Sequence, residues 1–209
     1  MEIIAFSGAQ GSGKTVTCKI IKDILHDYVD IYLISFADFL RDWIKTNLGN
    51  EVYEASLDRQ RKDKPLNESI CIQTDTSFVD IQTIATPREL LVAAGTFLRK
   101  INPDIFCAAI EETINQIDPK DNSLVLIDDI RFRNELKWLK EIDYPSTLVV
   151  VDRIDVNAEN EIKDFLEYEE AEYMYQTYSY NDPCTSVECR NGITTMLRTV
   201  TGIPIDYES

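Results

Sequence analysis

The sequence predicts an α/β domain in which helices flank a parallel β-sheet. Short apolar runs rich in β-branched residues alternate with helical stretches along the chain. Two of the runs, Ser123–Ile127 and Thr147–Val151, are apolar at every position or nearly so, which is typical of parallel strands covered on both faces. The chain has 209 residues, 44% of them hydrophobic and 28% charged, which indicates one globular domain with room for an inserted subdomain.

The N-terminal part supplies two strand-and-helix pairs. The run Glu2–Ser7 predicts a first strand, and the glycines after it lead into a helix from Lys14 to about Asp27. A second strand is expected at Ile31–Phe36, followed by a helix over Phe39–Leu48. Together with Ser123–Ile127 and Thr147–Val151, these elements favour a doubly wound sheet with right-handed crossovers.

About 85 residues separate the second and third expected strands, far more than one crossover needs. Thr86-Pro87-Arg88-Glu89 combines an N-cap, a proline at the first helical position and a capping-box glutamate, so a helix should begin there. Asn102-Pro103-Asp104 predicts a further helix that runs to about Gln116. We therefore expect a helical insertion over about 37–118, in which the polar stretch Asp63–Ile84 forms either a hairpin or a loop.

Charge and composition exclude several classes of protein. The 21 basic and 37 acidic residues give a net charge of −16, which argues against nucleic acid or an anionic membrane as a partner. The sequence contains no run of 18 apolar residues and no secretory signal, so a cytoplasmic protein is expected. His26 is the only histidine, which excludes histidine-based triads and metal sites with two histidines. The acidic stretch at about 153–182 is either a solvated helix face or a flap over the site.

One motif carries specific chemistry, and its residues are Gly8, Ala9, Gln10, Gly11, Ser12, Gly13, Lys14 and Thr15. They match the phosphate-binding pattern G-x-x-x-x-G-K-[ST], between a strand and a helix as that pattern requires. Glycines allow backbone N–H groups to surround phosphate oxygens at the positive end of the following helix. The sequence therefore predicts a nucleotide phosphate site in which Lys14 binds the β- and γ-phosphates and Thr15 offers its hydroxyl to Mg²⁺.

A second group of polar residues ends the strand expected at Ser123–Ile127. Asp128 and Asp129 follow its apolar residues, at the carboxyl ends of the strands, where α/β folds bind ligands. Arg131 comes two residues after Asp129. Neighbouring side chains on a strand point to opposite faces, so only one of the two aspartates can face the metal. The sequence has neither the D-x-x-G nor the N-K-x-D element of a GTPase, which leaves small-molecule phosphoryl transfer as the favoured class.

These residues resemble a known family. The block Asp129-Ile130-Arg131-Phe132-Arg133-Asn134-Glu135 is similar to the D-V-R-F-P-N-E signature of the deoxynucleoside monophosphate kinases of tailed bacteriophages. The segment at 36–41 resembles that family's F-A-D-P-L-K, and the segment at 88–106 resembles its R-x-L-L…G-T…G-R…P-D-x-W stretch. The chain departs from the family at Arg133 and Phe39, where the family has proline, and at Phe106, where it has tryptophan.

The resemblance implies a P-loop fold whose helical insertion binds the acceptor, and transfer of the ATP γ-phosphate to a deoxynucleoside monophosphate with Mg²⁺. It favours Asp129 over Asp128 on the metal side and adds Arg131 to Lys14 as a catalytic residue. The expected acceptor-binding residues are Arg99, Arg41, Arg88 and Asp38, and Arg153 is expected in a lid. The setting would be the host cytoplasm, and a homodimer stays open. Two alternatives stay open: a P-loop kinase for dephospho-coenzyme A or a ribonucleotide, and a nucleotide-dependent switch or ATPase.

Overall fold

The computed structural model describes residues 1–9, 11–58, 60–61, 63–65, 86–117, 123–153, 175–180 and 187–202. The side chains of 152–153, 175–180 and 187–189 are not among the described parts. The chain forms two compact units, each described below by itself. The first unit comprises Met1–Phe36 and Cys107–Ser209, and the second comprises Ala37–Phe106.

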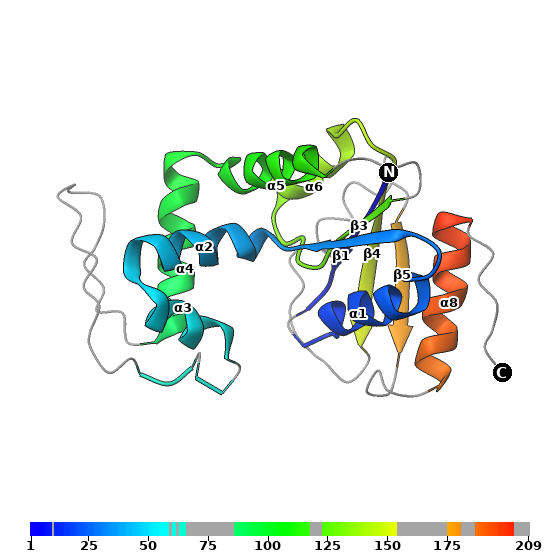
Figure 1. Cartoon of the computed structure of the whole chain (residues 1–209), viewed down its shortest axis with the longest axis horizontal. Helices are drawn as coiled ribbons and strands as arrows, with labels where there is room; N and C mark the ends of the chain where they lie inside the picture. Colours follow the sequence, from blue (N-terminus) through cyan, green and yellow to red (C-terminus); the bar gives the residue numbers. More distant parts are fainter. Residues whose placement is uncertain are drawn as a thin grey trace. The chain divides into compact units, whose positions relative to one another are not determined.

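A five-stranded parallel sheet forms the centre of the first unit, which confirms the predicted α/β class (Figure 1). Its strand order is β2-β3-β1-β4-β5, and every neighbouring pair is parallel. The strands are β1 (Glu2–Ser7), β2 (Asp30–Ile34), β3 (Ser123–Ile127), β4 (Ser146–Arg153) and β5 (Tyr175–Tyr180). The first strand of the chain therefore lies in the middle of the sheet, between β3 and β4.

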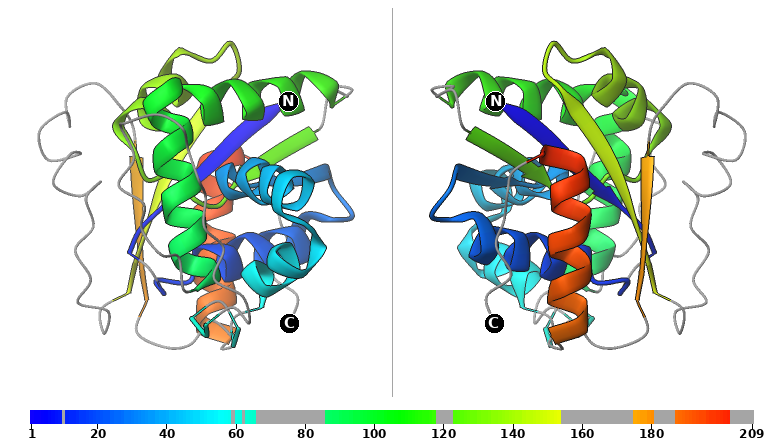
Figure 2. Two further views of the ribbon diagram at one scale, coloured as in Figure 1. Left: turned by 90° about the vertical axis from the view of Figure 1, so that its left-hand side faces the viewer. Right: turned by 90° about the vertical axis from the view of Figure 1, so that its right-hand side faces the viewer.

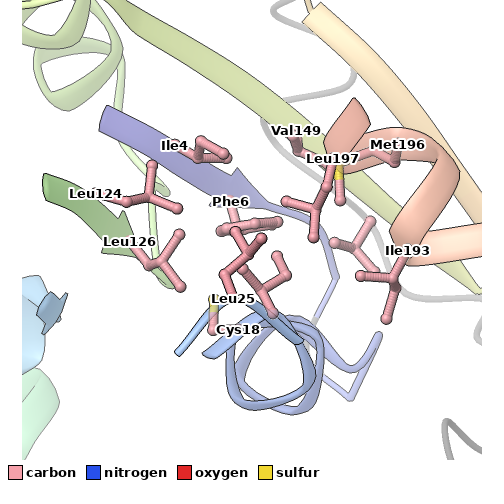
Figure 3. Close-up of a cluster of buried hydrophobic side chains, with 12 residues drawn as sticks. Ile4, Phe6, Cys18, Leu25, Leu124, Leu126, Val149, Ile193, Met196 and Leu197 are labelled. Atoms are coloured by element: carbon pink, nitrogen blue, oxygen red, sulfur yellow. The ribbon is translucent and has the colours of Figure 1, made fainter. Parts of the chain in front are cut away.

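Helices α1 (Lys14–Leu25) and α8 (Val187–Thr201) cover one face of this sheet. Figure 3 shows Phe6 at the centre of the buried cluster, with residues of β3 on one side and of α8 on the other. The other face carries side chains that are equally buried, and α5 (Ile105–Gln116) and α6 (Arg133–Glu141) lie on that side (Figure 2). Burial on both faces explains the continuous apolar runs at 3–6 in β1, 124–127 in β3 and 148–151 in β4.

The described part of the second unit consists mainly of helices α2 (Phe36–Leu48), α3 (Asn50–Leu57) and α4 (Pro87–Ile101), with α3 packed against α4. The predicted start of α4 is confirmed: the Thr86 hydroxyl accepts from the Glu89 N–H, and the Glu89 carboxylate accepts from the Thr86 N–H. This unit ends at Phe106, whereas the expected insertion extended to about residue 118. Residues from Cys107 onward belong with the sheet.

Two helices begin at residues other than those expected. Helix α2 begins at Phe36, three residues before the expected start at Phe39. Helix α5 begins at Ile105, because Asn102 ends α4 and its side chain then accepts from the Asp104 N–H. Asn102 therefore closes one helix and shapes the turn that precedes the next.

Part of the expected flap at 153–182 is a strand, since 175–180 pairs with β4 as β5. The rest of that flap falls at 154–174 and 181–182, outside the described residues, as does most of the polar stretch at 63–84. Within the described ranges, no helix has the length and apolar character needed to cross a membrane.

Candidate active site

The phosphate loop joins the end of β1 to the start of α1. Gly8, Gly11 and Gly13 have φ angles of +145°, +84° and +96°, in the region that L side chains rarely adopt. The Ser12 N–H donates to the Ala9 carbonyl at 3.1 Å, which closes the turn; Gln10 lies outside the described residues. Gly13 is the N-cap of α1, so the loop ends at the positive end of the helix dipole.

Gly8 fits against β4 because it has no side chain. A Cβ atom built there would lie 2.3 Å from the Val151 carbonyl oxygen. Gly8→Ala should therefore lower the free energy of unfolding by about 2–4 kcal/mol, through overlap added to backbone strain. Gly11→Ala is the matched control. The φ of Gly11 is also positive, but a Cβ atom built there has no described atom within 4 Å apart from its chain neighbours. This substitution should cost about 1 kcal/mol. Urea unfolding measures both, and equal losses would contradict the close approach to β4.

Lys14 closes the loop from its far end. Its ammonium group donates to the Gly8 carbonyl at 2.7 Å and to the Ala9 carbonyl at 2.8 Å. The pKa of Lys14 is lowered to about 8, first by burial and then by the nearby positive charge of Arg131, whereas Asp128 and Asp129 oppose the shift. The loop thus holds a half-buried cation whose charge a bound phosphate would stabilise.

Thr15 and Asp128 form the second contact of the site. The Thr15 hydroxyl donates to Asp128 Oδ2 at 2.7 Å. The other carboxylate oxygen, Asp128 Oδ1, is buried and has no hydrogen-bond partner among the described residues. An unpaired buried carboxylate oxygen is costly, and oxygen ligands with bound water are what Mg²⁺ prefers. This oxygen next to a threonine hydroxyl therefore fits a hydrated Mg²⁺ ion.

Asp129 points to the other side of β3. Its Oδ2 accepts from the Ser35 hydroxyl at 2.9 Å, and its Oδ1 accepts from the Phe36 N–H at 2.8 Å, where α2 begins. Burial raises the pKa of Asp129, as does the charge of Asp128, although the bonds from Phe36 and Ser35 oppose this. The resemblance favours Asp129 on the metal side, whereas in the structure Asp128 contacts Thr15 of the phosphate loop and Asp129 contacts Ser35 and the start of α2.

Glu135 fixes the loop that carries Arg131. This carboxylate is 1% exposed, and its Oε2 accepts from the Arg131 N–H at 2.8 Å and the Phe132 N–H at 3.0 Å. The loop starts beside β1, because the Ile130 N–H donates to the Phe6 carbonyl. Arg131 lies close enough to Lys14 and Asp129 to influence the pKa of each. The structure therefore brings Lys14, Thr15, Asp128 and Arg131 together in the first unit.

The expected acceptor-binding residues all belong to the second unit. Arg41 donates to Asp38 at 2.8 Å, one helical turn away on α2, and its buried Nε has no partner among the described residues. Arg88 forms a two-point ion pair with Asp63. The Arg99 guanidinium stacks on Phe106, with 4.3 Å between its Cζ and the ring centroid. Arg153 is the last residue of β4, and its side chain lies outside the described parts.

Sequence reasoning assigned no role to Ser35 or Glu135, and it favoured Asp129 on the metal side, whereas Asp128 is the aspartate that contacts Thr15. Strand alternation was the available signal for the aspartates. Leu124 and Leu126 pack in the cluster with α1, so the same alternation places Asp128 on the side of α1. No local pattern identifies Ser35, because its contact with Asp129 joins residues 94 positions apart.

No protein-family model and no curated protein matches the chain. Among solved structures, the chain is similar to a thymidylate kinase from Ehrlichia chaffeensis, with 12% identity, coverage of 96% of this chain and 98% of that chain, and a TM-score of 0.42. It is similar to a shikimate kinase from Acinetobacter baumannii at 13% identity, with coverage of 98% and 95% and a TM-score of 0.40. A cobyrinic acid a,c-diamide synthase from Mycobacterium smegmatis has 14% identity, coverage of 94% and 80%, and a TM-score of 0.41. The three TM-scores are nearly equal, so they do not single out any of these proteins. The assignment to the P-loop fold depends on the order of the strands and on the phosphate loop.

Proposed function

We propose that the protein transfers the γ-phosphate of ATP to a deoxynucleoside monophosphate. The observation that carries the proposal is the contact between Thr15 and Asp128 beside the Lys14 loop. This contact supports the proposal, because a lysine ammonium group and a carboxylate oxygen of the kind that Mg²⁺ prefers then lie at the same end of the sheet. The acceptor class rests on the residue blocks that resemble the phage kinases, above all Asp129–Glu135.

On the donor side, we assign the phosphates of ATP to the loop at 8–15. The ammonium group of Lys14 would exchange the Gly8 and Ala9 carbonyls for β- and γ-phosphate oxygens, which are better partners for a buried cation. Thr15 and Asp128 would hold Mg²⁺, which supplies charge neutralisation at the phosphates when bound.

Phosphoryl transfer to a monophosphate needs little acid–base chemistry, because the attacking atom is already an anionic oxygen. Catalysis then depends on positioning and on stabilising the charge that spreads over the transferred group. Lys14 and Arg131 are the two cations that we assign to this charge. Glu135 holds the backbone N–H of Arg131, and the charge of Arg131 is near enough to Lys14 to lower the pKa of that lysine.

We assign acceptor binding to the second unit. Arg99 is our first choice for the acceptor phosphate, because an arginine fork can bind two phosphate oxygens at once. Arg41 is the second choice, and its buried Nε, which has no partner within the described parts of the chain, supports a ligand near α2. Arg88 is the weakest candidate, since Asp63 already binds its guanidinium through two contacts.

The deciding experiment is a panel of acceptors with ATP and Mg²⁺, read by ADP release and by the phosphorylated product. The four deoxynucleoside monophosphates are compared with their ribose counterparts and with dephospho-coenzyme A. We expect at least one deoxynucleotide to be consumed with a higher kcat/KM than its ribose analogue. Equal values across all bases would favour a general nucleotide kinase. ADP release without any phosphorylated acceptor would indicate an ATPase.

Arg99→Ala tests the acceptor assignment. Loss of a charge-assisted contact to the phosphate should cost about 2 kcal/mol, or about 30-fold in acceptor kcat/KM, with the KM for ATP unchanged. Arg99→Lys should restore only part, because a point charge lacks the fork. Lys100→Ala is the matched control: it removes one positive charge at the exposed neighbouring position. If Arg99→Ala lowers only the melting temperature, the arginine is structural.

A further inference from the structure

The Arg99 guanidinium lies beside Gly95 of its own helix and contacts Phe106 at the start of α5. The guanidinium points back along α4 toward Gly95, four residues earlier. A Cβ atom at Gly95 would lie 3.3 Å from Arg99 Nη1, closer than most such contacts allow. Side chains of helical residues lean toward the helix N-terminus, so a long side chain at position i crosses the residue at i−4. The guanidinium occupies this space because Gly95 has no side chain.

Phe106 covers the guanidinium with the face of its ring. This side chain is 2% exposed, and the Arg99 Cζ lies 4.3 Å from its centroid, which is a cation–π stack. The ring is held in turn by Phe39 of α2, at 5.6 Å between centroids and with an interplanar angle of 87°. The N–H bonds of a guanidinium lie in its plane, so the contacts with Phe106 and with the space at Gly95 limit the directions in which the Arg99 donors can point.

We propose that Gly95 and Phe106 are positioning residues that hold the Arg99 guanidinium in the orientation that binds the acceptor phosphate. The inference rests on the proposed function, and it deepens it by naming what sets the geometry of the acceptor site. An arginine side chain has four rotatable bonds, and fixing them before the ligand arrives lowers the entropy lost on binding. Gly95 and Phe106 thus contribute to acceptor affinity through Arg99.

Gly95→Ala separates this role from a structural one. Alanine in a helix interior is more favourable than glycine by about 1 kcal/mol, so the variant should be as stable as the wild type or more stable. Its methyl group would nevertheless displace the guanidinium. We expect the KM for the acceptor to rise about 5-fold, with the KM for ATP within about twofold of wild type. A purely structural role predicts the opposite result: the stability of Gly95→Ala falls and its KM for the acceptor stays at the wild-type value.

Phe106→Leu is the second variant, because leucine keeps an apolar side chain and removes the ring face. The acceptor KM should rise about 5-fold here as well, through the lost cation–π stack. Each substitution is repeated in the Arg99→Ala background, as a double-mutant cycle. If both residues act through Arg99, neither should change the acceptor KM further once the guanidinium is gone.

The outcomes separate the inference from the function on which it rests. No turnover of any nucleoside monophosphate by the wild-type protein overturns both. Turnover by the wild type, together with an unchanged acceptor KM in Gly95→Ala and Phe106→Leu, overturns the inference alone. Effects of the same size with and without Arg99 also overturn it, because the residues would then act by another route.

Discussion

Lys14→Met should reduce turnover by about 10³-fold or more while the protein stays folded. Methionine keeps the unbranched apolar stem but removes the charge that we assign to the β- and γ-phosphates, where a missing cation is most costly in phosphoryl transfer. The fold should survive, because the variant also removes the cost of burying an ammonium group. Steady-state kinetics and thermal unfolding measure the two effects. Turnover close to wild type would refute the phosphate-loop assignment.

The pKa of Lys14 adds a pH test to the same residue. Since that pKa is lowered to about 8, Lys14 loses its charge as the pH rises through about 8. The kcat/KM for ATP reports on the free protein, so it should fall above this pH. Stability should change in the other direction: between pH 8 and the ordinary value of 10.5 the unfolded chain binds more protons, so this group favours the fold increasingly as pH rises. In Lys14→Met the stability contribution should vanish.

Asp128→Asn should reduce turnover by about 10²- to 10³-fold, because it removes the negative charge that we assign to Mg²⁺. Asparagine has nearly the same shape and can still accept from the Thr15 hydroxyl, so the loss should not come from unfolding. A higher Mg²⁺ concentration should restore part of the activity, which a fold defect would not allow.

Asp129→Asn is the matched control for Asp128→Asn, with the same change on the neighbouring residue. Its amide oxygen can accept from the Phe36 N–H and its amide group can donate to Ser35, so turnover should stay within about threefold. Asp129→Ala loses both contacts and should cost about 1–3 kcal/mol of stability. If Asp129→Asn abolishes turnover while Asp128→Asn retains it, the metal lies on the Asp129 side.

The parts of the fold that sequence predicted are those with local signals. The phosphate loop is a contiguous pattern, and β1, β3 and β4 are apolar because both their faces are buried. The start of α4 depends on Thr86 and Glu89, three residues apart. Each of these features is decided within one short segment of chain, which is why composition and spacing were sufficient.

The parts that sequence did not predict depend on distant partners. The edge strand β5 (Tyr175–Tyr180) mixes tyrosines with polar residues without a regular alternation, and its pairing with β4 is what makes it a strand. Helix α2 begins early because Asp129, 93 residues away, accepts from the Phe36 N–H. Choosing between Asp128 and Asp129 required knowing which face of β3 meets α1. In each case the deciding contact is absent from the local sequence.

The position of β1 in the sheet has a consequence for how the chain is made. β1 is synthesised before β3 and β4, yet it pairs with Leu124 and its neighbours in β3 and with Ser146–Val150 in β4. The apolar strand β1, which leads into the phosphate loop, therefore stays unpaired until β3 and β4 have been synthesised. Pairing between residues so far apart requires closure of a long loop, which slows folding. Among these three strands, β1 is thus exposed to aggregation and to chaperones for the longest time.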